Sequence, residues 1–298
     1  MTRGVAGLIV EVGGPRVPLT LVLVALLTLI TGCPPPGPPI APRTRGEALD
    51  RVNANLAQID RPLQCKGLVS FKFRDADERV RRFIGHEASL IYQPPQQLRL
   101  DVRSPGGVVA EFGSNLEQYW LWTDVPDIRK LWWGEWQAVG SGATRKLAIP
   151  PDELLDALIL RPLSRTLGTG PELTLRCVGD DHRLMYVRVG PDGRTSGARE
   201  VRLDAYPPHQ PVEIIDRRAD GGVVMHALLR GYRRVGPDGP YIPRGYVVMW
   251  PETDAEFRLD VHSAKFRPDL EPEVFDFPAG WTGERERLDD GDAGFPGG

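Results

Sequence analysis

Cysteine, histidine and acidic side chains are the groups of this chain that could carry out chemistry, and their spacing favours none of the common catalytic sites. The five histidines have no His-x-x-x-His spacing, and the sequence holds no Gly-x-Ser-x-Gly, P-loop or Cys-x-x-Cys motif. Asp180-Asp181-His182 has metal-binding side chains, but a cluster this short is more typical of a solvated turn. We therefore expect a non-enzymatic protein that needs no metal and no cofactor.

Cys33 stands apart because of the residues that precede it. Residues 17–32 carry no charge, and Arg3 and Arg16 lie before them, which is typical of a secretory signal. The apolar run is shorter than the roughly 20 residues of a spanning helix. Its end, Leu29-Ile30-Thr31-Gly32-Cys33, resembles the lipobox of bacterial lipoproteins. That resemblance implies cleavage before Cys33 and attachment of lipid to Cys33. The alternative is an ordinary signal peptide followed by a chance cysteine.

The leader also predicts the domain organisation and the compartment. We expect a signal peptide over 1–32, a lipidated Cys33 with a proline-rich tether over 33–43, a folded domain over 44–283 and a disordered, acidic, glycine-rich tail over 284–298. The lipid anchor would hold the protein in the cell envelope, on a membrane facing the periplasm. The residue after Cys33 is Pro34 and not the Asp that marks inner-membrane retention in some bacteria, which favours the outer membrane.

Composition and the remaining cysteines limit other possibilities. The chain has 298 residues with 37 Lys+Arg against 40 Asp+Glu, so its net charge of −3 excludes a nucleic-acid binder built on a general basic field. Three cysteines are too few for a disulfide scaffold. In an oxidising compartment Cys65 and Cys177 could form a disulfide if their Cα atoms lie within about 7 Å. Otherwise they are two buried free thiols.

Two helices and many short strands must position any site. Thr44 and Glu47 have capping-box spacing, which predicts a helix over 45–59. A second, short helix is predicted to begin at Pro151 and to end before Pro162. The apolar positions on these helices include Leu49, Val52 and Leu56 in the first and Leu155 and Leu158 in the second. Elsewhere apolar and polar residues alternate in short runs that are bounded by turn-forming residues. This pattern predicts about a dozen strands in a large antiparallel sheet.

Four segments of the sequence resemble segments of one known protein family. They are Gly67-Leu68-Val69-Ser70-Phe71, Pro95-Gln96-Gln97-Leu98-Arg99-Leu100-Asp101-Val102, Pro151-Asp152-Glu153-Leu154-Leu155 and Glu273-Val274-Phe275-Asp276-Phe277-Pro278. In this order they resemble the LolA/LolB-like family of lipoprotein carriers and receptors. The resemblance implies a mainly β (α+β) fold, in which a large curved antiparallel sheet forms an incomplete barrel lidded by the N-terminal helix and the short mid-chain helix. It also implies a hydrophobic cavity that receives acyl chains.

A cluster of tryptophans supports an apolar site independently of that resemblance. Five of the seven tryptophans lie between residues 120 and 136. Tyr119-Trp120-Leu121-Trp122 is apolar on both faces of a strand, and such a strand needs a cover on both faces. One cover could be the helices, and the other a ligand, a membrane or a partner. The alternative is a doubly covered core hairpin that binds nothing.

These observations lead to two hypotheses for function. In the first, the protein is a lipidated envelope protein that binds acyl chains of lipids or lipoproteins in a cavity whose lining follows from the strand pattern. The expected lining is Val69, Phe71, Leu98, Leu100, Trp120 and Trp132, under the two lid helices. In the second, the core is filled and the tryptophan-rich hairpin docks a protein partner.

Overall fold

The computed structural model describes residues 44–289, apart from 75–77, 126–127, 142–143, 145–146, 166–171, 179–180 and 190–194. The predicted signal peptide, the acylation site Cys33 and the tether lie outside the described residues. Among the described residues, no helix is long and apolar enough to cross a membrane.

The first described helix, α2 (Arg45–Leu56), begins where the capping pattern predicts. Thr44 Oγ1 accepts a hydrogen bond of 3.1 Å from the backbone N–H of Glu47, which satisfies one of the free donors of the first turn. The helix ends three residues earlier than the predicted boundary of 59. The backbone N–H groups of Gln58 and Ile59 bond to carbonyls three residues back, so the chain tightens into a turn ahead of Pro62.

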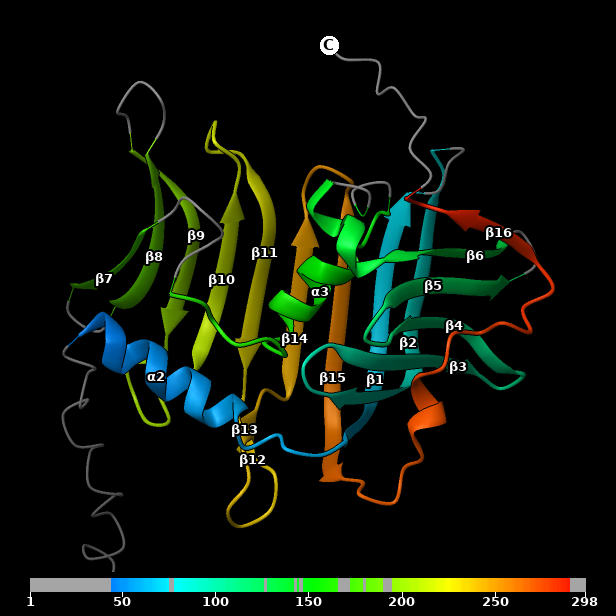
Figure 1. Ribbon diagram of the computed structural model, residues 1–298, viewed down its shortest axis with the longest axis horizontal. Coiled ribbons are helices and arrows are strands. Elements are labelled where there is room, and N and C mark those ends of the chain that lie inside the picture. Colours follow the sequence, from blue (N-terminus) through cyan, green and yellow to red (C-terminus); the bar gives the residue numbers. More distant parts are fainter. Residues whose placement is uncertain are drawn as a thin grey trace, which may run out of the picture. The chain divides into compact units, whose positions relative to one another are not determined.

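Strands make up most of the described chain (Figure 1). They are β1 (Leu63–Arg74), β2 (Val80–Gln93), β3 (Gln97–Ser104), β4 (Gly107–Ser114), β5 (Gln118–Val125), β6 (Ile128–Glu135), β7 (Glu172–Val178), β8 (Asp181–Val189), β9 (Thr195–Leu203), β10 (Pro211–Arg217), β11 (Val223–Arg230), β12 (Arg233–Arg234), β13 (Tyr241–Ile242), β14 (Gly245–Trp250), β15 (Ala255–Phe266) and β16 (Glu284–Arg287). Two short 3₁₀ helices, η1 (Trp136–Ser141) and η3 (Pro272–Phe275), and the α-helix α3 (Pro151–Ala157) interrupt them.

Within the described residues, fourteen of these strands form one sheet, in the order β16-β6-β5-β4-β3-β2-β1-β15-β14-β11-β10-β9-β8-β7. Neighbours pair antiparallel, except that β16 pairs parallel to β6. The end strands β16 and β7 do not pair with each other, so the sheet stays open. This confirms the predicted fold class, a mainly β protein with a large sheet not closed into a barrel.

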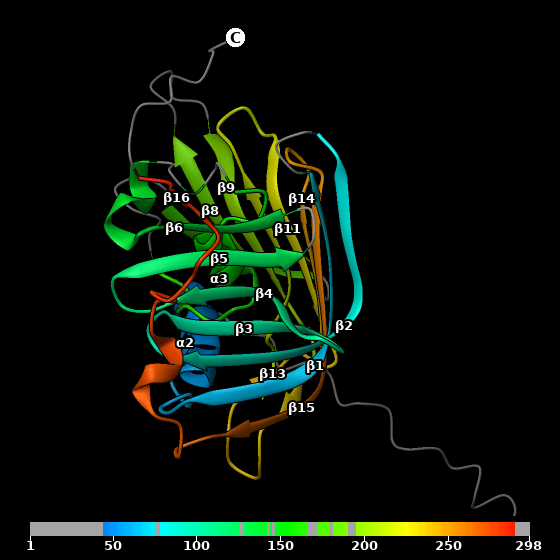
Figure 2. The same cartoon turned by 90° about the vertical axis from the view of Figure 1, so that its right-hand side faces the viewer.

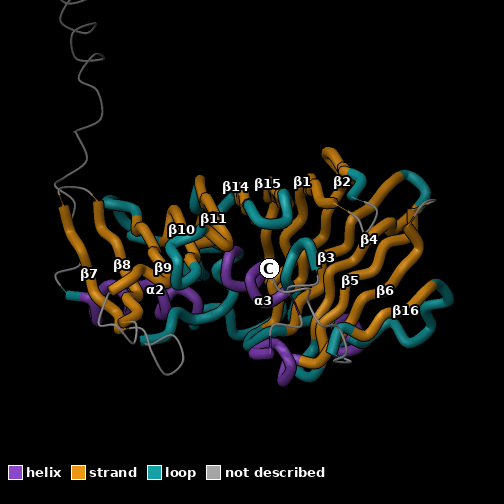
Figure 3. Tube along the Cα trace, turned by 90° about the horizontal axis from the view of Figure 1, so that it is seen from above, coloured by secondary structure: helices purple, strands orange, loops and turns teal. Residues whose placement is uncertain are grey.

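The sheet curves, and seen from above α2 and α3 lie on its inner side (Figure 3). The predicted lid residues Leu49, Val52, Leu56, Leu155 and Leu158 are all buried in the main hydrophobic core there. α2 lies over the part of the sheet that β7 to β11 form, and α3 lies nearer its middle, in contact with β11 and bonded to Trp250 of β14 (Figure 1). The two helices leave the half of the inner face at the β6 end to be covered differently.

A buried ion network fixes α3 to the sheet. Arg199 of β9 makes two bonds of 2.6 Å to Asp216 of β10 and one of 2.8 Å to Asp156 of α3. Arg161, beyond the helix, also bonds Asp156 at 2.6 Å. Burial raises the pKa of the Asp216 carboxyl, an effect that Arg199 opposes. Trp250 of β14 adds a hydrogen bond of 2.7 Å from Nε1 to Glu153. Ion pairs and hydrogen bonds thus fix α3 to the sheet, together with the apolar contacts of its leucines.

The chain after β15 crosses the outer face of β3 to β6 and then supplies β16 at the edge of the sheet (Figures 1 and 2). The prediction of a disordered tail from residue 284 is therefore wrong for its first residues. Glu284 pairs with Lys130 and Arg287 with Trp133 along β6, and Leu288 is buried. Residues 290–298 of that predicted tail lie outside the described residues.

Of the two alternatives for Cys65 and Cys177, the structure favours free thiols over a disulfide. Cys65 is a free, buried thiol on β1. Cys177 belongs to β7, and six strands separate β1 from β7 in the sheet. Because neighbouring strands lie about 4.8 Å apart, the two positions are much farther apart than a disulfide allows. Burial raises the pKa of the Cys65 thiol to about 12.

Candidate functional site

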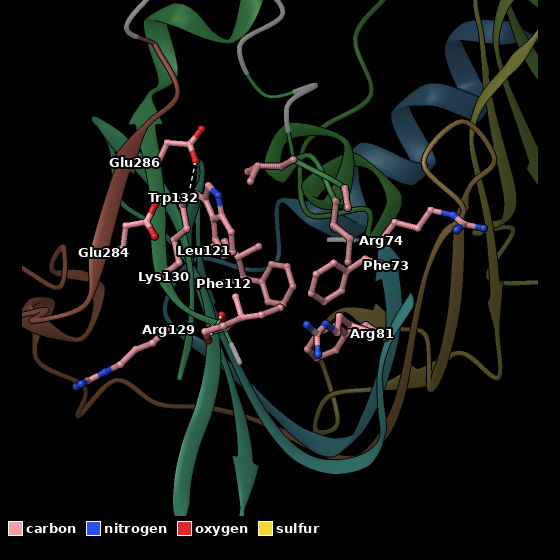
Figure 4. A pocket seen from close by; sticks show the side chains of 16 residues that line it. Phe73, Arg74, Arg81, Phe112, Leu121, Arg129, Lys130, Trp132, Glu284 and Glu286 are labelled. Carbon is pink, nitrogen blue, oxygen red and sulfur yellow. Dashed lines mark hydrogen bonds and ion pairs between the residues drawn. The ribbon is translucent and has the colours of Figure 1, made fainter. Parts of the chain in front are cut away.

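The half of the inner face that the helices leave uncovered contains a cavity of about 520 Å³. It lies between β1 and β2 on one side and β5, β6 and β16 on the other (Figure 4). The segment Leu147–Ile149, between η1 and α3, also contributes to its lining. This volume is within the range of pockets that hold small molecules.

Phenylalanines form one wall of the cavity because strand register places them side by side. Phe71 of β1 pairs with Phe83 of β2, and their stacked rings lie 4.2 Å apart. Phe73 stacks at 6.1 Å from Phe71, two residues along the same face. Phe112 of β4 meets Phe71 edge-on at 5.8 Å. Phe71, Phe73 and Phe112 line the cavity itself, with Phe83 behind them.

The opposite wall comes from the inner faces of β5 and β6. Leu121 of β5 pairs with Trp132 of β6, and both side chains line the cavity. Thr123 lies beside them, with its hydroxyl donating to the carbonyl of Ile128 at 2.9 Å. The hydroxyl proton of Thr123 is thus already engaged within the wall.

Charged side chains surround the apolar interior. Lys130 of β6 forms ion pairs with both inward-facing carboxylates of β16, Glu284 at 2.5 Å and Glu286 at 2.9 Å. Burial alone would lower the pKa of Lys130, but hydrogen bonds to these two glutamates outweigh it and raise the pKa. Lys130 therefore stays charged at neutral pH and holds β16 against β6. Its Nζ also lies 5.6 Å over the ring of Trp132.

The outer face of the tryptophan-rich hairpin is covered by the protein's own C-terminal segment. Trp120 meets Phe277 edge-on at 5.6 Å, and Trp133 meets the same ring at 5.4 Å. Trp122 lies 5.1 Å from Trp281. The sequence indicated that this hairpin needs two covers; the C-terminal segment supplies the outer one, and the inner face lines the cavity. The tryptophans thus do not form the open docking surface of the second hypothesis.

The predicted cavity residues divide into three groups. Phe71 and Trp132 lie in the lining of the cavity. Val69, Leu98 and Leu100 face the same inner side but are buried in the packed core, and none of them lines the cavity. Trp120 is on the outer face, where its Nε1 donates to the buried carboxylate of Glu111 at 2.7 Å. The prediction for Trp120 fails because successive residues of a strand face opposite sides, so Trp120 and Leu121 cannot share the cavity.

Several lining residues were not predicted. Leu147, Ala148 and Ile149 come from a connection with no periodic pattern, although their consecutive apolar side chains were a signal of burial. Glu284 and Glu286 belonged to the segment predicted to be disordered. The predicted lid residues do not line the cavity, since the two helices lie over other parts of the sheet.

The described residues also include the side-chain types that bind metal ions. In the part of the chain that the structure describes, no group of three or more His, Cys, Asp and Glu side chains could hold a metal ion. Of the cluster at 180–182, only part is described, and His182 is buried on β8. The lining combines apolar side chains, such as Phe71, Phe73 and Trp132, with charged ones at its border.

Comparison with known proteins finds similarity in structure but not in sequence. No family model and no curated protein matches the sequence. The chain is similar in structure to several solved proteins of low sequence identity. A LolA superfamily protein from Nitrosomonas europaea covers 78% of this chain with 98% of its own, at 12% identity and a TM-score of 0.47. An outer-membrane lipoprotein-sorting protein domain from Vibrio parahaemolyticus covers 76% with 95% of its own, at 11% identity and a TM-score of 0.46.

A third similar structure is a DUF1329 family protein from Desulfovibrio piger, which covers 78% of this chain with 96% of its own. Its identity is 8% and its TM-score 0.48. All of these similarities concern the fold alone.

Proposed function

We propose that this protein binds acyl chains of lipids or lipoproteins in the cavity on the inner face of its sheet and does so without catalysis. The observation that carries the proposal is the cavity of about 520 Å³ lined by Phe71, Phe73, Phe112, Leu121 and Trp132. Each buried CH₂ contributes about 0.8 kcal/mol, so a long chain has ample driving force before ordering costs are subtracted. Trafficking of lipids or lipoproteins in the envelope is the role that fits such binding.

The proposal includes an anchor at Cys33, which rests on the sequence of the leader. Lipid on Cys33 would tether the domain to a membrane facing the periplasm, the outer membrane on the argument from Pro34. Labelling cells with an alkyne-bearing palmitate tests this part separately. The label should appear on the chain and disappear in Cys33→Ala. An unchanged label in that variant would contradict the anchor without affecting the cavity.

Binding is tested by titrating the purified full chain with a fluorescent fatty acid. We expect saturable binding that Leu121→Trp weakens at least about tenfold, because the larger side chain fills the cavity wall. Leu68→Trp is the matched control, since Leu68 lies on the outer face of β1 and is 38% exposed. It should leave binding unchanged. Equal loss in both variants, or no saturable binding by the unaltered chain, would refute the proposal.

A further inference from the structure

The size of the cavity on the inner face limits how much of a lipid it can enclose. Its volume is about 520 Å³. An apolar cavity of about 150 Å³ holds one molecule of benzene, which is about 25 Å³ for each carbon atom. At that ratio the cavity has room for about 20 carbon atoms. One acyl chain of about 16–18 carbons therefore fits, whereas two such chains would need roughly 800–900 Å³.

The aromatic wall of the cavity is backed by packed core, so it leaves no room for a second chain. Phe112 meets Phe71 edge-on at 5.8 Å and Phe257 at 6.4 Å. Phe257 is fully buried, as are Val69 and Leu100 of the same hydrophobic core. Protein cores are packed as densely as organic crystals, so widening the cavity at this wall would force other core side chains to shift.

Two further sides of the cavity are closed in the same way. Towards α3, Ile149 lines the cavity and belongs to the same core as Leu154 of that helix. At the β6 side, Leu147 lines the cavity and forms a second, smaller core with Leu288, against which Trp132 packs. Packed side chains thus bound the apolar space. A polar head group would lie at the charged border of the cavity and not inside it.

We infer that the ligand is a lipid with a single acyl chain, such as a fatty acid or a lysophospholipid, and that the cavity encloses no second chain. This inference rests on the proposed function and adds the number and the length of the chains. A diacyl lipid would place one chain in the cavity and leave the other outside it. Taking such a lipid out of a bilayer would expose that second chain to water, which is unfavourable for each of its methylene groups.

Native mass spectrometry of the purified full chain tests the number of chains. The chain is incubated with equimolar palmitate, palmitoyl lysophosphatidylcholine and dipalmitoyl phosphatidylcholine, and the last two share the head group and differ only in the second acyl chain. We expect one bound single-chain lipid and at least about tenfold less of the diacyl lipid. The more abundant of palmitate and the lysophospholipid identifies the source of the chain. A smaller preference, or two bound single-chain lipids, overturns the inference and leaves the proposed function intact, while binding of none of the three overturns both.

The length of the chain is tested by competition against the fluorescent fatty acid with lysophosphatidylcholines of increasing chain length. Affinity should rise about two- to fourfold for each added carbon and level off near about 20 carbons, where the cavity is full. Levelling off by about 12 carbons, or a rise that continues to about 26, would contradict the match between chain and cavity. This comparison uses the unaltered chain and does not depend on how well any variant folds.

Phe73→Ala and Ile84→Ala form a matched pair of variants for the same assay. Phe73 lines the cavity, and in Figure 4 its side chain lies opposite that of Phe112. Removing its ring should move the length limit upward by about six carbons at the same volume for each carbon. Ile84 is 76% exposed on β2 and is not part of the lining, so Ile84→Ala should leave the limit unchanged. A limit that stays in place in Phe73→Ala, or that moves equally in both variants, would overturn the inference.

Discussion

Replacing Arg199 by methionine tests whether α3 is a fixed cover of the sheet. The guanidinium of Arg199 binds both oxygens of Asp216 and one oxygen of Asp156, and all three side chains are less than one-fifth exposed. Methionine has a similar length but no charge and no donor. In Arg199→Met, Asp216 would keep a buried negative charge without its cation, while Asp156 would still pair with Arg161.

The expected loss in free energy of unfolding follows from the unpaired buried carboxylate of Asp216. Removing one partner of a buried ion pair destabilises a protein by about 3–5 kcal/mol, because an uncompensated charge stays buried. Arg199→Met/Asp216→Leu removes both charges and should recover most of the loss, since an apolar pair of similar volume replaces them. The two single variants and the double variant together form a cycle that isolates the pairwise energy.

The stability loss in Arg199→Met should depend on pH in a definite direction. Burial already raises the pKa of Asp216, with Arg199 opposing the effect, so removing Arg199 should raise the pKa further. A carboxyl whose pKa is higher in the folded state binds its proton more tightly there. The destabilisation by its charged form is therefore full above the folded-state pKa and declines as the pH falls toward the unfolded-state pKa of about 3.9. The stability difference between Arg199→Met and the unaltered chain should therefore narrow as the pH is lowered from 7.

Urea unfolding followed by circular dichroism, repeated at several pH values from 7 downward, measures both the loss of stability and its dependence on pH. A loss below about 1 kcal/mol at pH 7 would refute the buried network. A difference that stays constant or widens on acidification would refute the argument for Asp216. Only the first of these results would mean that the ion network contributes little to holding α3.

Three further predictions concern other parts of the molecule. Phe277→Ala should lower the free energy of unfolding by about 2–4 kcal/mol and shift the tryptophan fluorescence, because its ring covers Trp120 and Trp133. Fatty-acid binding on the other face should persist. Lost binding with retained stability would contradict this division of faces. Cys65 should resist a thiol reagent at pH 8 until the protein unfolds, since burial raises its pKa to about 12, and rapid labelling of the folded chain would show that β1 is not packed as described. Lys130→Met should loosen β16 from β6, which would be measured as faster amide hydrogen exchange at 284–287. Exchange as slow as in the unaltered chain would mean that backbone pairing alone holds the strand.

Much of the fold could be predicted because its signals are local. The capping box at Thr44 and the leucines of α2 specify a helix within a dozen residues, and Pro151 with Glu153 does the same for α3. Alternation along the strands specifies a sheet. The resemblance to a known family supplied the remaining step, that the sheet stays open and carries helices on its inner side.

The cavity was harder to predict because its residues are fixed by contacts between distant segments. In Tyr119-Trp120-Leu121-Trp122 both faces are apolar, so the alternation does not reveal which side faces inward. That choice depends on Phe277, which lies more than 150 residues later and covers Trp120. Likewise, the charged sequence of β16 has the composition of a solvated tail, and only its pairing with β6 and the ion pairs to Lys130 make it a strand.

Native mass spectrometry of the purified full chain tests the central claim most directly, that the inner-face cavity holds an acyl chain. We predict a stoichiometric mass excess that is extracted into organic solvent as lipid, that persists in Leu68→Trp and that is lost in Leu121→Trp. A chain that carries no extractable lipid and binds no added fatty acid would contradict the claim. The same mass excess in Leu121→Trp would place the lipid outside the cavity.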